Sequence, residues 1–542
     1  MIPARVPRVL RMGPARLTAG LDHCRRLDLP AHRTLHGVLE PRELGELMAY
    51  ANEVDMRGRG GAAFPFARKL RAVADAAKGG DCVVLINGAE GEPASSKDAM
   101  MLTRNPHLVL DGAVLAAEAL GAREVVLATA GGEVAEASVN AAVAERRAAN
   151  IAGGAESRIP IRVVGIKERF ISGEGGALVK AVNGEEGIPP GRKKRAATSG
   201  VDGLPTLLSN TETYAQFALL AEYGPEKYAE VGTSKEPGTI LLTVSGGAAH
   251  GAVIETPTGA LLADVLALCE ADVGEGVLIG GYHGAWLSAE AAQTAVISRE
   301  GMKAAGATLG AGIIVPLGET TCPLGEAARV ASYLAAESAG QCGPCRLGLP
   351  DMARAVNALV EGTGSVDAVR RSVRVVERRG ACFHPDGTAK FVLSAMDAFE
   401  TEIATHLEHG SCGRPVRGVL PMPEHEAEAE YRLEVDWSRC VGHGLCAHLL
   451  PEFVDLDDYG FPSFRKIPAF MAKEARRAVD MCPALALRLA QTTGDGHGPG
   501  PKPAASPLRL VKDGTLKKSG ESTPRLARLG VPRISKVGGT AG

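Results

Sequence analysis

Residues 81–182 alternate between short apolar runs that end near glycine and longer runs with helical periodicity. This alternation limits the possible folds more than any other feature of the chain. The apolar runs occupy residues 82–88, 123–132 and 159–166. Residues 133–150 have the pattern of a helix between the second and third of these strands. Strands that alternate with helices usually form a parallel sheet covered by helices, so we predict an α/β domain over residues 51–235.

Further segments surround this domain, because a chain of 542 residues is too long for one hydrophobic core. The predicted segments are an irregular N-terminal arm at 1–50, the α/β domain at 51–235, a β-rich unit at 236–318, a helical domain at 319–410, a linker rich in proline and glutamate at 411–430, a small α+β unit at 431–490 and a disordered tail at 491–542.

Charge and cysteine content narrow the class of protein. A net charge of −3 argues against nucleic acid as a bulk partner. No apolar run approaches the roughly 20 residues that span a bilayer, and the N-terminus lacks the apolar core of a secretion signal. Eleven cysteines in such a chain favour metal or redox chemistry over disulfides. We therefore expect a cytoplasmic redox protein without a transmembrane segment, which could sit at the periphery of a membrane complex.

Four loops carry the candidate binding residues, and the first is GRGGAAFP at 58–65. Its glycines at 58, 60 and 61 allow the backbone to pass close to a flat or anionic ligand. Lys69, in the helix expected next, could reach a phosphate. A mobile loop is the alternative, and the G-x-G-x-x-G dinucleotide fingerprint is absent.

The other three loops are NGAEGEP at 87–93, GEG at 173–175 and SNTET at 209–213. Asn87 offers both a donor and an acceptor at the end of a strand, where α/β proteins bind ligands. Glu90 could face the ligand, although such an acid is more often solvated. Glu174 begins a predicted helix, where a carboxylate is favourable by charge alone. Asn210 and Thr213 could bind a ligand or cap a helix.

Taken together, the four loops resemble the flavin-binding subunit of respiratory NADH dehydrogenase, the 51-kDa-type subunit of complex I and its hydrogenase and formate dehydrogenase relatives. That family reads G-R-G-G-A-G-F-P, N-A-D-E-x-E-P-G, G-E-E and N-N-x-E-T in the same order. The resemblance covers about residues 35–408. It implies a flavin-binding α/β domain, a β-grasp (SLBB-like) unit at 236–318 and a helical bundle that carries a [4Fe–4S] cluster.

The resemblance also assigns roles by position. FMN would bind to Gly58, Arg59, Gly60, Gly61, Lys69, Asn87, Asn210 and Thr213. Phe64 would be the surviving aromatic side chain of those that sandwich the adenine of NADH, since the positions near Ala72 and Ala196 are not aromatic. Glu90 and Glu174 would lie beside flavin and nicotinamide. Ala89 and Gly175 replace two acids of the family, so FMN is the firmer expectation and NAD(P)H the weaker one.

Cys342 and Cys345 lie in the run ESAGQCGPCR, where the family reads E-S-C-G-x-C-x-P-C-R. Cys382 supplies the family's distal cysteine, but Ala339 stands at the position of the first. The resemblance implies a [4Fe–4S] or [3Fe–4S] cluster with an incomplete ligand set, for which Ser338, Cys322 and Cys412 are candidate replacements. The alternatives are buried thiols without a cluster, or zinc held by three cysteines.

The unit at 431–490 resembles a small bacterial ferredoxin. Cys440, Cys446 and the pair Cys482-Pro483 match three cluster ligands of that family, and His443 replaces the middle cysteine. This pattern is typical of [3Fe–4S] ferredoxins, many of which serve cytochrome P450 systems, and [4Fe–4S] is the alternative. We interpret His443 as a cap of the cluster pocket. The acids at 452–458 could dock a basic partner or simply be solvated.

These expectations combine into an oxidoreductase. NAD(P)H would reduce FMN, and single electrons would pass through the helical-domain cluster and the ferredoxin domain to an external acceptor such as a P450 or a dehydrogenase. A thioredoxin-like [2Fe–2S] protein is a further possible partner. The alternatives are an electron carrier that never binds nicotinamide and a scaffold that has lost its cofactors. His23, His32 and His36 are expected at the surface and without a metal.

Overall fold

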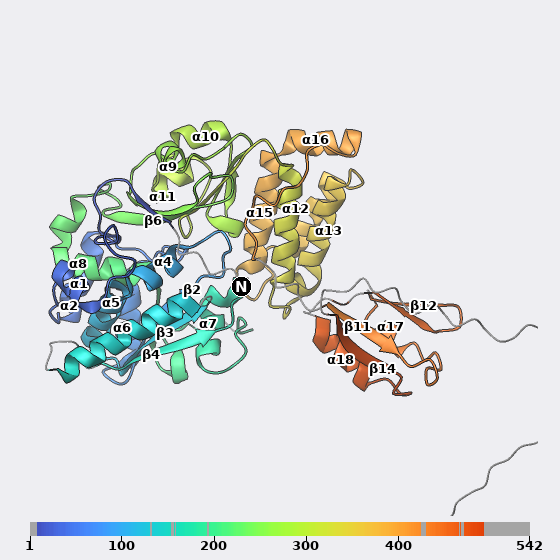
Figure 1. Ribbon diagram of the computed structural model, residues 1–542, viewed down its shortest axis with the longest axis horizontal. Coiled ribbons are helices and arrows are strands. Elements are labelled where there is room, and N and C mark those ends of the chain that lie inside the picture. The colour runs from blue at the N-terminus through green and yellow to red at the C-terminus, as the bar shows by residue number, and fades with distance from the viewer. Residues whose placement is uncertain are drawn as a thin grey trace, which may run out of the picture. The chain divides into compact units, whose positions relative to one another are not determined.

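The computed structural model describes residues 8–130, 133–152, 157, 159–191, 195–423, 430–451, 453–465, 467 and 471–492. They belong to two compact units, Met1–His425 and Glu426–Gly542 (Figure 1). The expected disordered tail lies outside the described residues from 493 on, as do the first seven residues of the expected arm. No helix among the described residues combines the length and the apolar composition that crossing a membrane requires.

A four-stranded parallel sheet forms the centre of the α/β region, in the order β4-β3-β2-β5. Its strands are β2 Val83–Ala89, β3 Glu124–Ala130, β4 Ile161–Ile166 and β5 Thr206–Asn210. The three strands predicted from apolar runs are confirmed as β2, β3 and β4, and all pairings are parallel. Both central strands are almost wholly buried, which explains their continuous apolar sequence.

Helices cover the faces of this sheet. They are α2 Leu44–Glu53, α3 Phe66–Ala77, α4 Lys97–Arg104, α5 Pro106–Leu120, α6 Glu133–Ile151, α7 Gly175–Val182 and α8 Thr211–Ala229. The helix predicted at 133–150 is confirmed as α6. Gly112 on α5 lies against the backbone of Tyr214 on α8, and a Cβ at this position would overlap the Tyr214 carbonyl oxygen. This glycine therefore lets the two helices pack closely.

A second sheet of six strands has the order β1-β7-β6-β10-β8-β9. Its strands are β1 Arg8–Arg11, β6 Thr239–Val244, β7 Ala252–Pro257, β8 Gly276–Ile279, β9 Ala285–Leu287 and β10 Ile313–Leu317. Short helices α9 Leu262–Leu268, α10 Ala289–Thr294 and α11 Arg299–Ala304 accompany it. The expectation of an irregular arm is wrong for β1, which pairs in parallel with β7.

Two histidines predicted at the surface are buried instead. His32 and His36 lie on α1 (Leu29–His36). His32 Nε2 lies 2.8 Å from Asp111 Oδ2, and His36 Nδ1 lies 2.8 Å from Glu222 Oε2. Burial lowers the pKa of His32. The prediction failed because their acidic partners come from α5 and α8, far away in the sequence. His23 is exposed, as expected.

Five helices form the helical region: α12 Pro323–Ala336, α13 Leu349–Val360, α14 Val366–Val376, α15 His384–Ala398 and α16 Glu400–His409. Figure 1 shows α12, α13 and α15 side by side, with α16 at one end of them. The segment after α16 returns along α12, where the carboxylate of Glu326 accepts hydrogen bonds from the backbone of residues 417–420. The first part of the expected linker is therefore packed against this region.

The second unit is small. Strand β11 (Glu430–Val435) pairs antiparallel with β14 (Leu487–Thr492), and β12 (Val454–Leu456) pairs with β13 (Pro462–Phe464). Helices α17 (Leu445–Leu449) and α18 (Ala472–Asp480) complete it. Its core comprises Leu433, Leu450, Val454, Ile467, Ala475 and Ala478. This is an α+β arrangement with its own apolar core.

Candidate flavin and iron–sulfur sites

The carboxyl edge of the parallel sheet brings two predicted residues together. Asn87 near the end of β2 and Asn210 at the end of β5 are register partners. The Asn87 side chain donates a hydrogen bond to the Gly173 carbonyl oxygen at 3.0 Å, which ties β2 to the third loop. Asn210 caps α8 by accepting from the Glu212 backbone N–H at 3.1 Å. The capping alternative for Asn210 is therefore confirmed, while its amide also donates to Asp98.

The glycine-rich first loop is anchored on both sides. The backbone N–H of Arg59 donates to Thr213 Oγ1 at 2.9 Å, and its carbonyl oxygen accepts from Lys97 Nζ at 2.7 Å. A Cβ on Gly60 would lie 3.2 Å from the Asn210 Cβ, so a larger residue would push the loop away. The loop is therefore held against the fourth loop, contrary to the mobile-loop alternative.

Lys97 and Glu212 hold these loops together, and neither was predicted from the sequence to have a role. Lys97 Nζ lies 2.6 Å from Glu212 Oε2, and both side chains are buried. Glu212 Oε1 also accepts from the Leu241 backbone N–H at 3.1 Å, which connects the two sheets. Their position in the sequence could have indicated a role, since Lys97 lies four residues after the second loop and Glu212 lies within SNTET. Removing either partner would strongly destabilise the folded protein, because the other charge would remain buried and unpaired.

A cavity of about 840 Å³ lies between α3, α7 and the edge strand β5. It is lined by Lys69 and Glu174 among the predicted residues, and also by Gly175, Leu208 and Gln341. Lys69 Nζ donates to the Leu208 carbonyl oxygen at 3.0 Å, and burial lowers the pKa of Lys69. Clefts of this size accommodate a nucleotide-sized ligand.

The remaining predicted residues lie elsewhere. Gly58, Arg59 and Gly61 line a second cavity of about 380 Å³. Asn87, Glu90, Asn210 and Thr213 are not among the residues that line either cavity, and Phe64 is 46% exposed. Ala196 lines the larger cavity, in agreement with the expected loss of an aromatic wall there. The structure therefore divides the predicted residues between two cavities and the loops around them.

Three buried polar atoms in the four loops have no hydrogen-bond partner among the described residues. They are Arg59 Nε, Glu92 Oε1 and Ser209 Oγ. Buried polar atoms are nearly always paired in native proteins, so three such atoms in neighbouring loops point to a missing polar partner. Together with Lys69 at the cavity wall, these donors and acceptors fit an anionic, hydroxyl-rich ligand such as FMN.

Glu90 is half-buried and caps a helix. It accepts from the Ser95 hydroxyl and from the backbone N–H groups of Asp98 and Ala99 at the start of α4. Burial, together with the nearby Asp98 carboxylate, raises the pKa of Glu90 to about 7. The alternative of a fully solvated acid is therefore wrong for Glu90.

Glu92, two residues further on, belongs to the second loop but was given no predicted role. Its Oε2 accepts from the Tyr282 backbone N–H at 2.9 Å, and burial raises its pKa to about 8. Glu174 instead caps α7, where its carboxylate accepts from the Ala177 backbone N–H at 2.9 Å. The second and third loops thus contribute three carboxyl groups, of which Glu174 lines the larger cavity.

Cys342, Cys345 and Cys382 lie close enough to influence one another's pKa. Burial raises the pKa of the Cys345 thiol to about 12, and the neighbouring Cys342 contributes to this shift. Burial likewise raises the pKa of Cys382, and the charge of Glu174 raises it further. Gln341, next to Cys342, lines the cavity itself. Gln341 and Glu174 therefore connect the cavity to the neighbourhood of these thiols.

The first cluster position is not filled by another cysteine. Cys322 precedes α12, whereas Ala339 follows it, so the 14-residue helix separates them by about 20 Å. Cys412 lies with Cys322, because their ligand atoms are within 4.8 Å of each other. The prediction that either replaces the missing thiolate is therefore wrong. Ser338 is close by, since its hydroxyl lies 3.5 Å from the Cys345 carbonyl oxygen.

In the second unit, Cys440, Cys446 and Cys482 line one pocket, which His443 also lines. The backbone N–H of Ala486 donates to Cys482 Sγ at 3.4 Å, as expected around a thiolate ligand. Burial raises the pKa of Cys446. His443 is exposed.

Comparisons with known proteins agree with this organisation. Residues 51–218 match the Nuo51 FMN-binding domain, residues 325–406 match the NADH-ubiquinone oxidoreductase-F iron-sulfur binding region, and residues 433–489 match a 4Fe-4S single cluster domain. The family resemblance inferred from the four loops and the cysteines is thereby confirmed.

Relatives from other organisms support the same conclusion. The F-type component of the NADH-quinone oxidoreductase of Mycobacterium tuberculosis is 27% identical over 386 residues, 68% of this chain and 86% of that protein. The HndC component of the NADP-reducing hydrogenase of Solidesulfovibrio fructosivorans is 26% identical over 430 residues, 76% of this chain and 84% of that one.

A crystal structure of an NAD+-reducing [NiFe]-hydrogenase in the H2-reduced state superposes with a TM-score of 0.65 at 25% identity, covering 74% of this chain and 68% of that chain. The chain is therefore similar to the F-type components of NADH-quinone oxidoreductase, and its three matched regions correspond to an FMN-binding domain, an iron-sulfur binding region and a 4Fe-4S single cluster domain.

Proposed function

We propose that this chain oxidises NAD(P)H and delivers the electrons singly to iron at Cys342, Cys345 and Cys382. One observation carries the proposal: the cavity lined by Lys69 and Glu174 is also lined by Gln341, the neighbour of Cys342. A ligand in this cavity would lie next to the iron site. Bound FMN supplies the required chemistry, because flavins accept a hydride and release electrons one at a time.

The loops would hold FMN by close backbone contact and charge. Lys69 is the buried cation suited to its phosphate, and Arg59 and Ser209 offer unpaired polar atoms. The remaining proposed contacts are Gly58, Gly60, Gly61, Asn87, Asn210 and Thr213. Glu90 and Glu92, whose pKa values lie at about 7 and about 8, could hold a proton beside the site at neutral pH. Glu174 would face the nicotinamide from the cavity wall.

The iron sites would have three thiolates each. Backbone N–H groups approach the helical-region cysteines, and those of Ala381 and Cys345 hold the pKa of Cys342 low although burial opposes this. Ala339 leaves one corner without a thiolate, which favours a [3Fe–4S] cluster, or a [4Fe–4S] cluster with a different fourth ligand. Cys440, Cys446 and Cys482 would hold the second cluster. Relatives are named as subunits of larger enzymes, so a partner protein is expected to take the electrons.

A carrier that does not bind nicotinamide is the second candidate. The larger cavity has alanines at 196 and 197, and none of its lining residues is aromatic. An adenine ring would therefore lack the stacking partner that the family provides, and Phe64 does not line this cavity. This observation favours electrons arriving from another protein rather than from NAD(P)H.

Anaerobic reduction of the purified full chain separates the two candidates. Bound flavin should bleach within seconds of adding NADH or NADPH; flavin that bleaches only with dithionite indicates the carrier, and absence of flavin contradicts both. Lys69→Gln should lower flavin content, because it removes the buried cation. Lys78→Gln, an exposed lysine just after α3, is the matched control and should retain it.

A further inference from the structure

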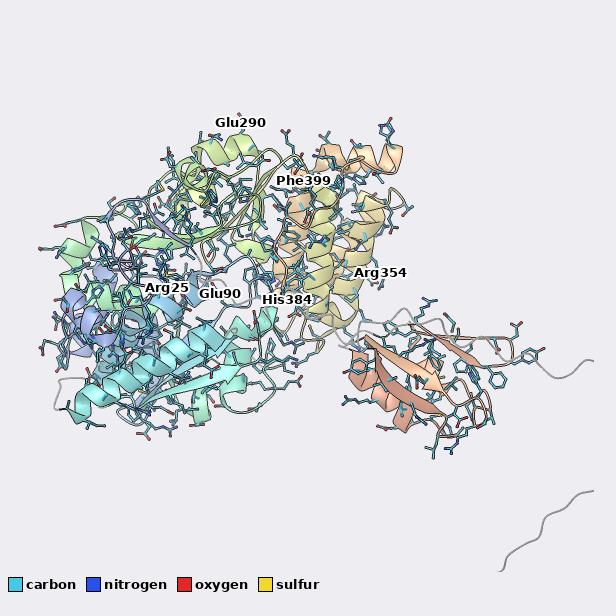
Figure 2. All side chains as sticks on the ribbon, in the orientation of Figure 1. Arg25, Glu90, Glu290, Arg354, His384 and Phe399 are labelled. Carbon is cyan, nitrogen blue, oxygen red and sulfur yellow. The ribbon has the colours of Figure 1, made fainter. Side chains whose placement is uncertain are left out.

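Four metal-binding side chains meet at the end of the helical region that lies away from Cys342. Cys322 precedes α12, Glu402 and His406 are one turn apart on α16, and Cys412 follows that helix. Their ligand atoms all lie within 4.8 Å of one another. Figure 2 places Phe399, next to α16, and His384, next to Cys382, at opposite ends of α15. This group is therefore separate from the cluster cysteines.

The distances suit a single tetrahedral ion. Cys322 Sγ lies 3.4 Å from His406 Nε2 and 3.7 Å from Glu402 Oε1, and the latter two atoms are 3.4 Å apart. Zinc bonds of about 2.3 Å to sulfur and about 2.0–2.1 Å to nitrogen and oxygen place tetrahedral donors about 3.3–3.8 Å apart. Cys322, Glu402 and His406 are thus already spaced as zinc ligands, and the thiol of Cys412 lies within 4.8 Å of their donor atoms. An iron–sulfur cluster needs thiolates spread around several iron atoms.

Neighbouring groups orient each donor toward the same point. The ring of His406 shares a 2.7 Å hydrogen bond with the Val360 carbonyl oxygen through Nδ1, which must donate, so Nε2 carries the free lone pair. Arg414 donates to Glu402 Oε2 at 2.6 Å, which leaves Oε1 for a metal. The Gly325 backbone N–H donates to Cys322 Sγ at 3.2 Å. Such outer contacts are typical of built zinc sites.

We propose that Cys322, Glu402, His406 and Cys412 bind one Zn2+ ion. Four protein ligands close the tetrahedron, so the site is structural rather than catalytic. The ion would fasten the segment after α16 to the start of α12, where the Cys322 backbone N–H already donates to the Pro415 carbonyl oxygen at 3.0 Å. This inference does not depend on the proposed electron transfer.

Metal analysis of the reduced full chain tests the proposal. Zinc should be present at about one ion per chain, and Cys412→Ser should lose it while iron content stays unchanged. Cys24→Ser, another half-buried cysteine, is the matched control and should keep zinc. Cys342→Ser should show the reverse, with less iron and full zinc. Absence of zinc from the wild type would overturn the proposal, as would an unchanged zinc content in Cys412→Ser. A Cys322–Cys412 disulfide in the protein as purified would also overturn it.

A second measurement on the wild-type protein tests the proposal even if the Cys412→Ser variant fails to fold. Chelator-treated wild-type protein should bind one equivalent of Co2+ with the intense visible bands of a tetrahedral thiolate site, and Zn2+ should displace it. His406→Gln should bind Co2+ more weakly and shift these bands. A wild-type protein that shows no tetrahedral cobalt spectrum contradicts the assignment, whatever the behaviour of the variants.

Discussion

The two ends of the helical region carry cysteines in different chemical settings. At one end, Cys342, Cys345 and Cys382 lack the fourth thiolate that Ala339 replaces, and Gln341, next to Cys342, lines the larger cavity. At the other end, Cys322 and Cys412 meet a histidine and a carboxylate in a closed set of four donors. Gln341, beside the incomplete set, lines a cavity, whereas the complete set lies between α12, α16 and the returning segment. The comparison suggests that one end handles electrons and the other holds the structure together.

Replacing Cys345 with serine should have the largest effect on this contrast. Cys345 is buried, so its loss should remove the helical-region cluster and roughly half of the total iron, while zinc remains. Iron and zinc analysis with electron paramagnetic resonance checks this. Cys269→Ser, also buried, is the control for loss of a thiol as such. Joint loss of iron and zinc in Cys345→Ser alone would show that the two ends are not independent.

Ala339→Cys should repair the incomplete end. The added thiolate completes the family's run of cysteines and should raise iron by about one atom per chain, converting a [3Fe–4S] signal into a [4Fe–4S] signal. Low-temperature spectra of the oxidised and reduced protein measure the change. Ala336→Cys, at the last residue of α12, is the control and should leave the spectra unaltered. An identical spectrum for Ala339→Cys and wild type would mean that another side chain already occupies the fourth position.

At the other end, Arg414→Met should weaken zinc binding by about 10–100-fold. Arg414 donates to Glu402 Oε2, and this contact orients Oε1 toward the proposed ion. Competition with a chromogenic chelator measures the affinity. Arg354→Met removes an exposed arginine of a local ion pair and serves as the control. Equal affinities for Arg414→Met and wild type would remove the argument from oriented donors.

The smallest effect concerns the second loop. Tyr282 links this loop to the segment after α16, since its backbone N–H donates to Glu92 and its hydroxyl to the Pro421 carbonyl oxygen. Burial raises the pKa of Glu92 to about 8, so the folded state binds the proton more tightly than the unfolded state does. Stability from this group is present at low pH and is lost as the pH rises toward 8, by about 3 kcal/mol between pH 6 and 9.

Glu92→Gln should remove this dependence, so its thermal unfolding temperature should fall less between pH 6 and pH 9 than that of the wild type. Glu90→Gln is the comparison within the same loop, and its effect should be centred nearer pH 7. Iron and zinc contents should be unchanged in Glu92→Gln. A parallel pH profile for wild type and Glu92→Gln would show that this carboxyl group is ionised in the folded protein.

Local sequence patterns predicted the parts of the molecule that are local in the chain. The apolar runs of β2, β3 and β4 identified the parallel sheet, and the short spacing of Cys342 and Cys345 predicted a metal site. Contacts between residues far apart in the sequence could not be predicted from these local patterns. Strand β1 meets β7 more than two hundred residues later, and Cys322 meets its three companions about ninety residues later. His32 was misplaced for the same reason, since Asp111 lies on another helix.

Electron delivery from NAD(P)H to the incomplete end is tested most directly by freeze-quenched paramagnetic resonance after anaerobic mixing with NADH. In the wild-type chain, flavin absorbance should bleach and the iron signal of the helical region should change on the same timescale. In Cys345→Ser the flavin should bleach while that iron signal is missing. If wild-type flavin bleaches and the iron at Cys342, Cys345 and Cys382 stays oxidised, the cavity and the cluster do not share an electron path.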